Sequence, residues 1–335
     1  MNDQLQQPQD LITLAEEALQ RSGVSADNAA PVARALVAAE LDGLASHGLS
    51  RLPFYADQAA SGKVNGQASP AVKSRGAVIN VDADRGFAYR AIRLGLDAGI
   101  ERARETGMAA VAIANSHHFG VAGYHVEQAA EQGMLTLAFG NTPAAMAPWG
   151  GTEPVFGTNP IAFAAPRNGQ PPLVIDLSLS KVARGKIMVA NKRGESIPEG
   201  WALDPDGQPT TDPKAALAGS MVPLGDAKGS AMALMVELLT AGLTGSNFAF
   251  EASSFFEAEG DAPRVAQLFL LFNPAFFAGA DVFDSRLAAM SAAITRQAGA
   301  RLPGERRLKV RDAAAAGVSV PETLLAELRQ RAGRD

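Results

Sequence analysis

The sequence predicts an α/β fold in which a core containing a β-sheet is flanked by helices at both ends of the chain. Two observations carry this prediction. Apolar segments typical of strands alternate with amphipathic segments typical of helices from about residue 78 to residue 180. Residues 11–62, 285–299 and 320–333 instead space their apolar side chains three and four apart, as helices do. The length of 335 residues fits about two domains.

The N-terminal part is predicted to be helical throughout. A first helix covers 11–23 and ends in a glycine. A second covers 25–43, where Ser25 or Asp27 can cap the N-terminus. The same spacing of apolar residues continues over 46–62, so this stretch is also predicted to be helical.

The later elements follow from periodicity and from stop signals. A strand of β-forming residues at 77–84 leads into an amphipathic helix at 87–107. The segments 199–213 and 300–317 are predicted as connections, the first because it is dense in Pro, Asp and Gly. The remaining strands are predicted at 108–116, 134–142, 161–166, 172–180 and 264–274, and the remaining helices at 122–133, 229–245, 285–299 and 320–333.

The composition favours a soluble protein. The net charge of −5 and the pI of about 5.5 argue against nucleic acid or an anionic membrane as a partner, because both select basic surfaces. The polar N-terminus lacks the pattern of a signal peptide, and no apolar run reaches the roughly 20 residues that a membrane span needs. We therefore expect a cytoplasmic location. The absence of cysteine excludes disulfides, thiolate metal sites and thiol nucleophiles.

All four histidines lie in two short stretches, which is the first indication of chemistry. His47 lies in "LASHGLSRLPFY", and His117, His118 and His125 lie in "ANSHHFGVAGYH". Adjacent histidines on one backbone point in divergent directions, and no carboxylate follows at a typical ligand spacing, so we expect no metal site. No G-x-G-x-x-G follows a predicted strand, so the usual dinucleotide fingerprint is missing.

The pair His47 and Arg51 suits a small acid with a reactive carbon. Histidine can donate a proton near neutral pH, and the planar guanidinium of arginine binds a carboxylate through two hydrogen bonds. On a helix, residues four apart face the same way, so both side chains are predicted to point to one side. The alternative is a capping serine at Ser46, a histidine with structural bonds only and a surface arginine.

Three later stretches combine glycines or strand ends with polar side chains. Gly120 and Gly123 free the backbone near a helix start, where N–H groups attract anions such as a pyrophosphate. Thr158 precedes a strand, and Asp176 ends an apolar run before several cations. Lys228 lies in a glycine-bounded helix start, which suits phosphate or carboxylate. For each stretch the alternative is an ordinary turn or a solvated loop.

Six stretches occur in an order that is typical of one family. They are "SHGLSRLPFY", "NSHHFGVAGYH", "MAPWGGTEPVFGTNPIAFAAP", "DLSLSKVARGKIMVA", "GWALDPDGQPTTDP" and "PLGDAKGSAMALMVELL". Together they resemble the malate/L-lactate dehydrogenase family of NAD(P)-dependent oxidoreductases, which lacks a Rossmann fold. The resemblance covers nearly the whole chain.

This resemblance implies a non-Rossmann α/β fold with a largely antiparallel central sheet and helical N- and C-terminal regions. Residues 1–75 and 285–335 would form a helical region for substrate binding and dimerisation. Residues 76–284 would form the NAD(P)-binding α/β region. The resemblance also implies a homodimer with its active site near the subunit interface.

The resemblance assigns site residues by position. His47 matches the proton donor, and Ser46 and Lys186 match its relay partners. Arg51 and Thr158 match contacts to a substrate that carries a carboxylate. Cofactor contacts are implied for His118, Phe119, Gly120, Val121 and Ala122, for Asp176, Leu177 and Ser178, for Lys228 and Gly229, and for Pro303, Gly304, Glu305 and Arg306.

The stretch "GDAKGSA" distinguishes two branches of the family. Enzymes of hydroxy acids usually have bulkier residues where this chain has Ala227 and Ser230. The stretch resembles the branch that reduces Δ1-pyrroline-2-carboxylate to L-proline and Δ1-piperideine-2-carboxylate to L-pipecolate. A candidate apolar wall for the ring is provided by Phe248, Phe250, Phe255 and Phe256. We therefore expect an NAD(P)H-dependent reductase that acts on a C=N bond. The alternatives are a 2-hydroxy acid dehydrogenase and a binding protein that has lost catalysis.

NADPH is expected as the cofactor, with NADH as an alternative. A 2′-phosphate needs cations, and arginine clusters supply them. Arg301, Arg306 and Arg307 lie in "ARLPGERR", which matches the late cofactor contact of the family.

Overall fold

The centre of the protein is a seven-stranded sheet with the strand order β2, β3, β4, β11, β5, β6, β7. The structure, a computed structural model, describes residues 3–334, apart from the side chains of residues 3, 4 and 315. Neighbouring strands in this sheet are antiparallel except for β3 and β4, which are parallel. The prediction of a largely antiparallel central sheet is therefore confirmed. The strands are β2 (Ala71–Arg75), β3 (Val78–Asp82), β4 (Met108–Ser116), β5 (Leu135–Gly140), β6 (Ile161–Arg167), β7 (Gln170–Leu177) and β11 (Val265–Phe272).

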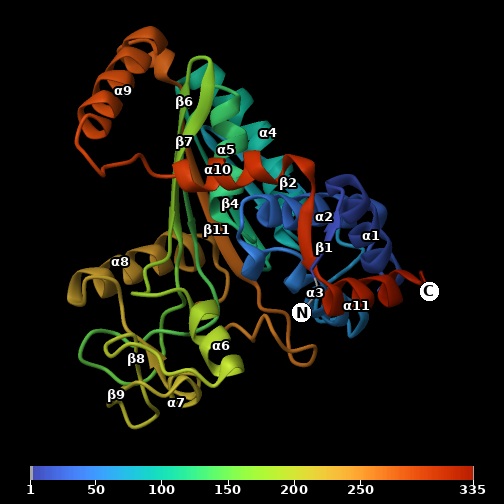
Figure 1. Ribbon diagram of the computed structural model, residues 1–335. Helices are drawn as coiled ribbons and strands as arrows, with labels where there is room; N and C mark the ends of the chain where they lie inside the picture. The colour runs from blue at the N-terminus through green and yellow to red at the C-terminus, as the bar shows by residue number, and fades with distance from the viewer. Residues whose placement is uncertain (1–2, 335) are drawn as a thin grey trace.

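Helices α4 (Ala88–Thr106) and α5 (Ala122–Glu131) cover one face of this sheet (Figure 1). They bury its aliphatic side chains in the first of three hydrophobic cores. Helix α4 comes close to the sheet because it carries glycines at the crossing. A Cβ on Gly95 or Gly99 would lie 2.6 or 2.5 Å from the side chain of Val111. A larger residue at either position would push the helix off the close-packed sheet.

Segments from both ends of the chain form a helical layer beside the sheet (Figure 1). Its helices share the second core, and its two-stranded sheet pairs β1 with β12 in antiparallel register. The helices expected at both ends are thus present, whereas β1 and β12 were not predicted, since strands of four residues show little alternation. The elements are β1 (Asp3–Gln6), α1 (Pro8–Arg21), α2 (Ala26–Leu41), α3 (Leu52–Ala60), β12 (Val318–Pro321) and α11 (Glu322–Ala332).

The stretch 46–62 is not one helix as predicted. Two short 3₁₀ turns, η1 (Ala45–His47) and η2 (Leu49–Arg51), precede α3. The break has a tertiary cause, because the carboxylate of Glu40 accepts the Leu49 N–H at 2.7 Å. A Cβ on Gly48 would collide with that same carboxylate, so a larger residue would displace the Glu40 side chain that holds this turn.

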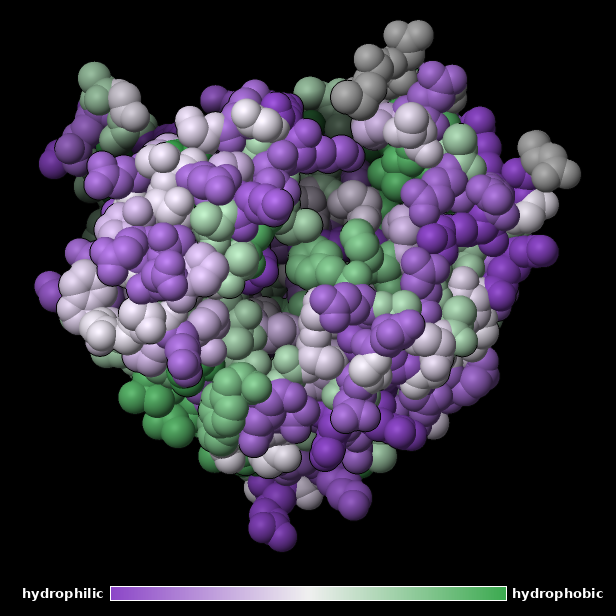
Figure 2. All heavy atoms as spheres, turned by 90° about the horizontal axis from the view of Figure 1, so that it is seen from below, coloured by the Kyte–Doolittle hydropathy of each residue, from purple (hydrophilic) through white to green (hydrophobic). Residues whose placement is uncertain are grey.

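A third group of elements lies beyond one end of the sheet, in the lower left of Figure 1. It surrounds the third hydrophobic core, and its small sheet has the order β10, β8, β9. Seen from below, the surface is hollowed near its centre, where hydrophobic side chains show among hydrophilic ones (Figure 2). The elements are α6 (Arg184–Arg193), β8 (Ala202–Leu203), β9 (Pro209–Thr210), α7 (Pro213–Ala218), β10 (Ser220–Met221), α8 (Ala227–Glu237) and the π-helical turn η3 (Leu238–Gly242). Helix α6 was not predicted.

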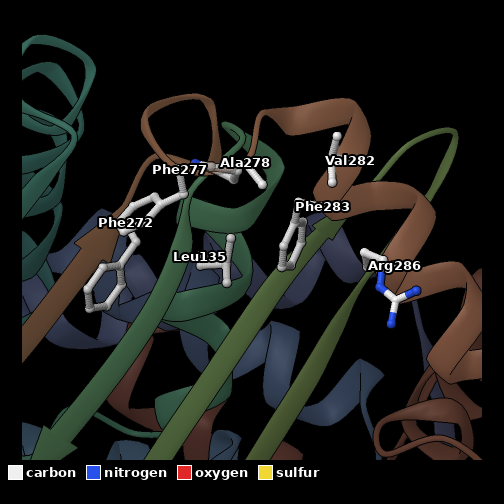
Figure 3. A pocket seen from close by; sticks show the side chains of 8 residues that line it. Leu135, Phe272, Phe277, Ala278, Val282, Phe283 and Arg286 are labelled. Atoms are coloured by element: carbon white, nitrogen blue, oxygen red, sulfur yellow. The ribbon is translucent and has the colours of Figure 1, made fainter.

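Helix α9 (Ala280–Thr295) projects from the opposite end of the sheet (Figure 1). Between it and the sheet lies an apolar groove of about 310 Å³, lined by residues that include Phe272, Phe277 and Phe283 (Figure 3). Helix α10 (Glu305–Ala313) forms where a connection was predicted. No helix described between residues 3 and 334 is long and apolar enough to cross a membrane.

Candidate active site

The ends of several strands meet at one end of the sheet, and predicted site residues follow them. The register aligns the C-terminal ends of β4, β5 and β7 with the N-terminal ends of β11 and β6. The segments next to these ends carry His117, Asn141, Thr158 and Ser178. The topology of the sheet therefore brings together stretches that are far apart in the chain.

Ser46, His47 and Arg51 form one group of contacts, but on 3₁₀ turns rather than on an α-helix. The Ser46 hydroxyl oxygen lies 3.1 Å from Nδ1 of His47, and Arg51 Nε donates to the main-chain oxygen of Ser46 at 2.7 Å. The guanidinium carbon of Arg51 lies 4.6 Å from the centroid of the Phe256 ring, within cation–π range. Among the described residues the terminal nitrogens of Arg51 have no hydrogen-bond partner, so they are available to an anion.

His47 is a neutral imidazole at pH 7. Burial and the positive charge of Arg51 lower the pKa of His47 to about 4. Its ring centroid lies 5.8 Å from that of His118. In the tautomer whose Nδ1–H donates to the Ser46 hydroxyl, Nε2 carries the free lone pair. His47 can then accept a proton at Nε2.

The ring of His118 is buried and held by a chain of hydroxyl groups. Its Nδ1 lies 2.6 Å from the hydroxyl of Tyr55, which lies 3.2 Å from the hydroxyl of Tyr89. The ring packs on Phe255 with a centroid distance of 5.0 Å. Gly120 has a φ of +68°, and a Cβ there would lie 2.6 Å from the Tyr89 hydroxyl oxygen, so both backbone and space require glycine.

Three of the predicted cofactor segments converge on β7. The main-chain N–H of Gly123 donates to the carboxylate of Asp176 at 2.7 Å. Burial raises the pKa of Asp176 although this hydrogen bond opposes the shift. A Cβ on Gly304 would lie 3.1 Å from the main-chain oxygen of Val174. The start of α5, the end of β7 and the start of α10 therefore approach one another closely.

The fourth predicted cofactor segment joins the same region through main-chain bonds. Leu224 N–H donates to the Leu179 oxygen at 2.7 Å, and Leu179 N–H donates to the Thr158 oxygen at 2.8 Å. The first turn of α8 follows, with Lys228 exposed and Gly229 packed against the main chain of Leu224. The segment after β7 thus forms main-chain hydrogen bonds both to Thr158 and to the residues that precede α8.

Lys186 lies near the Ser46–His47 pair but does not bond to it. A Cβ on its neighbour Gly185 would lie 3.3 Å from the Cβ of Ser46, so the start of α6 packs against the candidate catalytic turn. The Lys186 side chain is exposed. Within residues 3–334 the hydroxyl of Ser46 pairs with His47 only. The direct relay between Lys186 and this pair is therefore not formed in this structure.

Arg307, one of the arginines expected to bind a 2′-phosphate, is occupied by carboxylates. It bonds to Glu127 at 2.6 Å and to Asp42 at 3.0 Å, and Arg311 bonds to the same two carboxylates. Burial opposes ionisation of Glu127, but the two guanidiniums outweigh it and lower the pKa of this carboxyl. Arg301 and Arg306 are exposed. In the part of the chain that the structure describes, no group of three or more His, Asp or Glu side chains could hold a metal ion.

Polar residues beneath the site escaped the sequence analysis. The Gln58 carbonyl oxygen lies 2.9 Å from Nε2 of His117, and its amide nitrogen donates to the Phe255 oxygen at 2.8 Å. The ammonium of Lys63 donates to the main-chain oxygens of Ser254, Glu257 and Glu259 at 2.8 to 3.0 Å. These bonds fix the loop that brings Phe255 and Phe256 to the site. The sequence did contain one indication of these bonds: Gln58 lies three residues after Tyr55, on the buried face of α3, where a polar side chain needs a partner.

Only part of the candidate apolar wall lies at the site. Phe255 packs on the ring of His118, and Phe256 lies under Arg51. Phe248 and Phe250 instead stack on each other with a centroid distance of 5.7 Å, and Phe250 is exposed.

Known proteins resemble the chain along most of its length. The family model described as malate/L-lactate dehydrogenase matches residues 6–329. A (2R)-3-sulfolactate dehydrogenase (NADP(+)) of Chromohalobacter salexigens is 59% identical, with 95% of each chain covered. A Δ1-pyrroline-2-carboxylate/Δ1-piperideine-2-carboxylate reductase of Pseudomonas putida is 40% identical, with 97% of this chain and 96% of the relative covered. A crystal structure of Δ1-piperideine-2-carboxylate reductase from Pseudomonas syringae aligns with a TM-score of 0.93 at 38% identity, covering 98% and 99% of the chains.

These identities overturn the prediction of a cyclic-imine reductase. The sulfolactate dehydrogenase shares 59% of its aligned residues with this chain, against 40% for the imine reductase of Pseudomonas putida. Ser230, one of the residues that suggested the imine branch, accepts the Trp149 N–H at 2.9 Å and so supports a neighbouring loop. The resemblance of the ordered motifs is confirmed at the level of the family, and the chain belongs to the malate/L-lactate dehydrogenase family.

Proposed function

We propose that the chain is an NADP-dependent dehydrogenase of a small 2-hydroxy acid, with 3-sulfolactate or an acid of similar charge as its substrate. The arrangement of Ser46, His47 and Arg51 carries the proposal. It combines a neutral imidazole that can accept a proton with a guanidinium whose terminal nitrogens have no partner within residues 3–334. The name of the relative from Chromohalobacter salexigens supports both the hydroxy acid and NADP. NADP is also the cofactor that the sequence predicts.

Arg51 would hold the carboxylate of the substrate. Its Nε is committed to the main-chain oxygen of Ser46, which fixes the guanidinium and leaves two terminal nitrogens for bidentate binding. A sulfonate adds a second negative charge, for which a second cation is needed. Arg184 and Lys186 stand on either side of Gly185, which packs against Ser46. They are the cations that we assign to the second acidic group.

His47 would accept the proton of the substrate hydroxyl. A pKa of about 4 keeps the free imidazole unprotonated, which suits a base. A carboxylate bound to Arg51 would offset part of the positive charge that lowers this pKa. The pKa of His47 therefore rises when the substrate binds. Oxidation requires this, because the imidazole must accept the hydroxyl proton only after the substrate is in place.

NADP⁺, when bound, supplies the hydride acceptor. The segments that we assign to it are 118–122, 176–178, 228–229 and 303–306, with Thr158 assigned to the substrate. The start of α5, the end of β7 and the start of α10 approach so closely that a Cβ on Gly123 or Gly304 would lie 3.1 Å from an atom of Asp176 or Val174. Exposed Arg301 and Arg306 are the cations left for the 2′-phosphate after Arg307 has been paired with carboxylates.

The two regions would divide the work as the sequence predicts. Ser46, His47 and Arg51 come from residues 1–75, and most of the cofactor segments come from residues 76–284. We retain a homodimer in the cytoplasm as part of the proposal. The apolar groove beside α9 is a surface that a second copy would cover (Figure 3).

A comparison of substrates tests the proposal. NADP⁺ reduction is followed with (2R)-3-sulfolactate, malate and lactate, and NADPH oxidation with Δ1-pyrroline-2-carboxylate. We expect the highest kcat/KM with sulfolactate, and we expect Lys186→Ala to lower it more for sulfolactate than for lactate. Lys192→Ala, further along α6, is the matched control. A higher kcat/KM with lactate than with both sulfolactate and malate would show that the site does not bind a second acidic group. Absence of turnover with every hydroxy acid would reject the proposed function.

A further inference from the structure

Glu237, near the C-terminal end of α8, is a buried carboxylate without a cation. Its exposed fraction is 3%, and no salt bridge to it occurs among the residues that the structure describes. One oxygen accepts Asn159 Nδ2 at 2.8 Å. The other accepts Asn141 Nδ2 at 3.2 Å and the Ala249 N–H at 3.1 Å. Burial raises the pKa of Glu237, and within residues 3–334 only hydrogen-bond donors oppose this shift.

Two of the donors, Asn141 and Asn159, come from the segment of Thr158 and from the segment that it contacts. Asn141 is followed in the chain by Thr142, and Asn159 follows Thr158. The Thr142 hydroxyl accepts the Thr158 N–H at 2.9 Å and lies 3.3 Å from the Thr158 hydroxyl. Glu237 thus holds both the residue next to Thr158 and the residue next to its hydrogen-bond partner.

The backbone around Thr158 needs such support. Asn159 has a φ of +41°, a conformation that side-chain-bearing residues adopt at a cost. A Cβ on Gly157 would collide with the main chain and the hydroxyl of Thr142. The two segments are therefore pressed together in a strained arrangement, and the bond from Asn159 to Glu237 offsets part of that strain.

We propose that Glu237 is a positioning residue that sets the place of the Thr158 hydroxyl in the active site. The inference rests on the proposed function, in which Thr158 contacts the substrate. A carboxylate is suited to this task because both of its oxygens only accept, and every group aimed at it donates. A glutamine has the same shape, but its amide would turn N–H groups toward an N–H donor. The positions of Asn141 or Asn159 would then shift, and Thr158 would shift with them.

The test compares Glu237→Gln with Glu251→Gln. Glu251 is the matched control, since it also accepts a main-chain N–H, that of Phe248 at 2.9 Å, but is exposed. We expect Glu237→Gln to lower kcat/KM for the hydroxy acid on the order of 10- to 100-fold, as for a misplaced contact, with little change in the KM for NADP⁺. Thr158→Val should cause a similar loss. The double variant should lose no more than Thr158→Val alone, because both changes remove the same contact.

A second readout needs no substrate. In NMR spectra of threonine-methyl-labelled protein, Thr158→Val identifies the Thr158 resonance by its loss. That resonance should move or broaden in Glu237→Gln and stay in place in Glu251→Gln. An unmoved resonance, kcat/KM within twofold of the parent, or losses that add in the double variant would overturn the role of Glu237. Should Glu237→Gln fail to fold, Asn159→Gly removes one donor at a φ that glycine tolerates, and the same outcomes apply. If the parent oxidises no hydroxy acid, the proposed function fails while the NMR result still decides the positioning role.

Discussion

Tyr55 and His118, 63 residues apart in the chain, are joined by a 2.6 Å hydrogen bond between the phenol oxygen and Nδ1. Burial raises the pKa of Tyr55 to about 12, so its hydroxyl keeps its proton and can donate. Burial, followed by the charge of Arg51, holds the pKa of His118 well below its usual value, so the ring is neutral. The bond therefore favours the tautomer with the proton on Nε2 and attaches α3 to the segment after β4.

Tyr55→Phe should destabilise the protein by about 1–3 kcal/mol, because it leaves a buried ring nitrogen without a partner. Tyr89→Phe is the matched control, since it removes only the 3.2 Å contact to Tyr55 and keeps the bond to His118. Urea unfolding of the three proteins measures the difference. If both variants lose the same free energy of unfolding, the bond to His118 contributes no more to stability than the contact between the two tyrosines.

His47→Ala should lower turnover by roughly 10²- to 10⁴-fold, the usual contribution of a general base. NADP⁺ binding, followed by fluorescence titration, should change little because His47 lies outside the segments assigned to the cofactor. Ser50→Ala serves as the control, since this hydroxyl bonds to the Ala45 oxygen at 2.6 Å in the same turns. Turnover close to that of the parent would remove His47 from the proposed role.

The two reaction directions should differ in their pH dependence. Oxidation needs His47 unprotonated, so kcat/KM for the hydroxy acid should stay level as pH falls from 7 and decline only toward the pKa of about 4. Reduction needs the imidazolium, so its kcat/KM should rise as pH falls over the same range. Initial rates in both directions between pH 5 and 8 provide the measurement. A rate of oxidation that halves near pH 6.5 would contradict the lowered pKa of His47.

Mild acid should destabilise the fold through its buried imidazoles. Burial lowers the pKa of His117 to about 3 and that of His125 to about 4, and it holds the pKa of His118 well below 6.5. Below pH 6.5 the unfolded chain binds protons that the folded chain excludes, so stability falls with pH until the folded values are reached. Each imidazole contributes about 1.4 kcal/mol per pH unit over this range. Thermal unfolding at pH 7.5 and 5.5 should therefore show a clear loss of Tm at the lower pH, and His125→Asn should reduce that loss.

Arg307→Ala should cost on the order of 1–3 kcal/mol, because it removes one of the two guanidiniums that pair with the buried carboxylates of Asp42 and Glu127, while Arg311 remains. Arg104→Ala, which breaks an exposed pair with Glu101, should cost only about 0–1 kcal/mol. Chemical denaturation compares the two variants. Similar losses would mean that the network around Arg307 acts as an ordinary surface pair.

The sequence predicted which candidate residues lie together better than it predicted the backbone that carries them. The stretch around His47 was recognisable because its residues are close together in the chain, and the structure places the Ser46 hydroxyl against Nδ1 of His47 and Arg51 Nε against the main-chain oxygen of Ser46. Their helical spacing was wrong because the contact of Glu40 with Gly48 and Leu49 is tertiary and leaves no periodic signal. For the same reason the hydrogen bond between Gln58 and His117 was not foreseen.

The choice of substrate failed for a related reason. Ser230 was interpreted as a mark of the imine branch, but the structure gives its hydroxyl a role in holding the loop of Trp149. Likewise, Arg307 was counted as a free cation because the sequence does not reveal that Glu127 and Asp42 approach it from other helices. A residue type at a motif position predicts which chemistry is available, whereas its partners are decided by packing.

The pairing of β1 with β12 has a consequence for how the protein is made. The ribosome makes the N-terminal helices first, yet their layer is completed only by β12 and α11, which come much later in the sequence. Until these two elements have been made, the apolar faces of α1 and α2 lack part of their cover, and the delay exposes them to chaperones or to other nascent chains. Deletion of β12 and α11 should therefore lower the yield of native protein more than loss of a peripheral helix would, because the first elements made would have nothing on which to close.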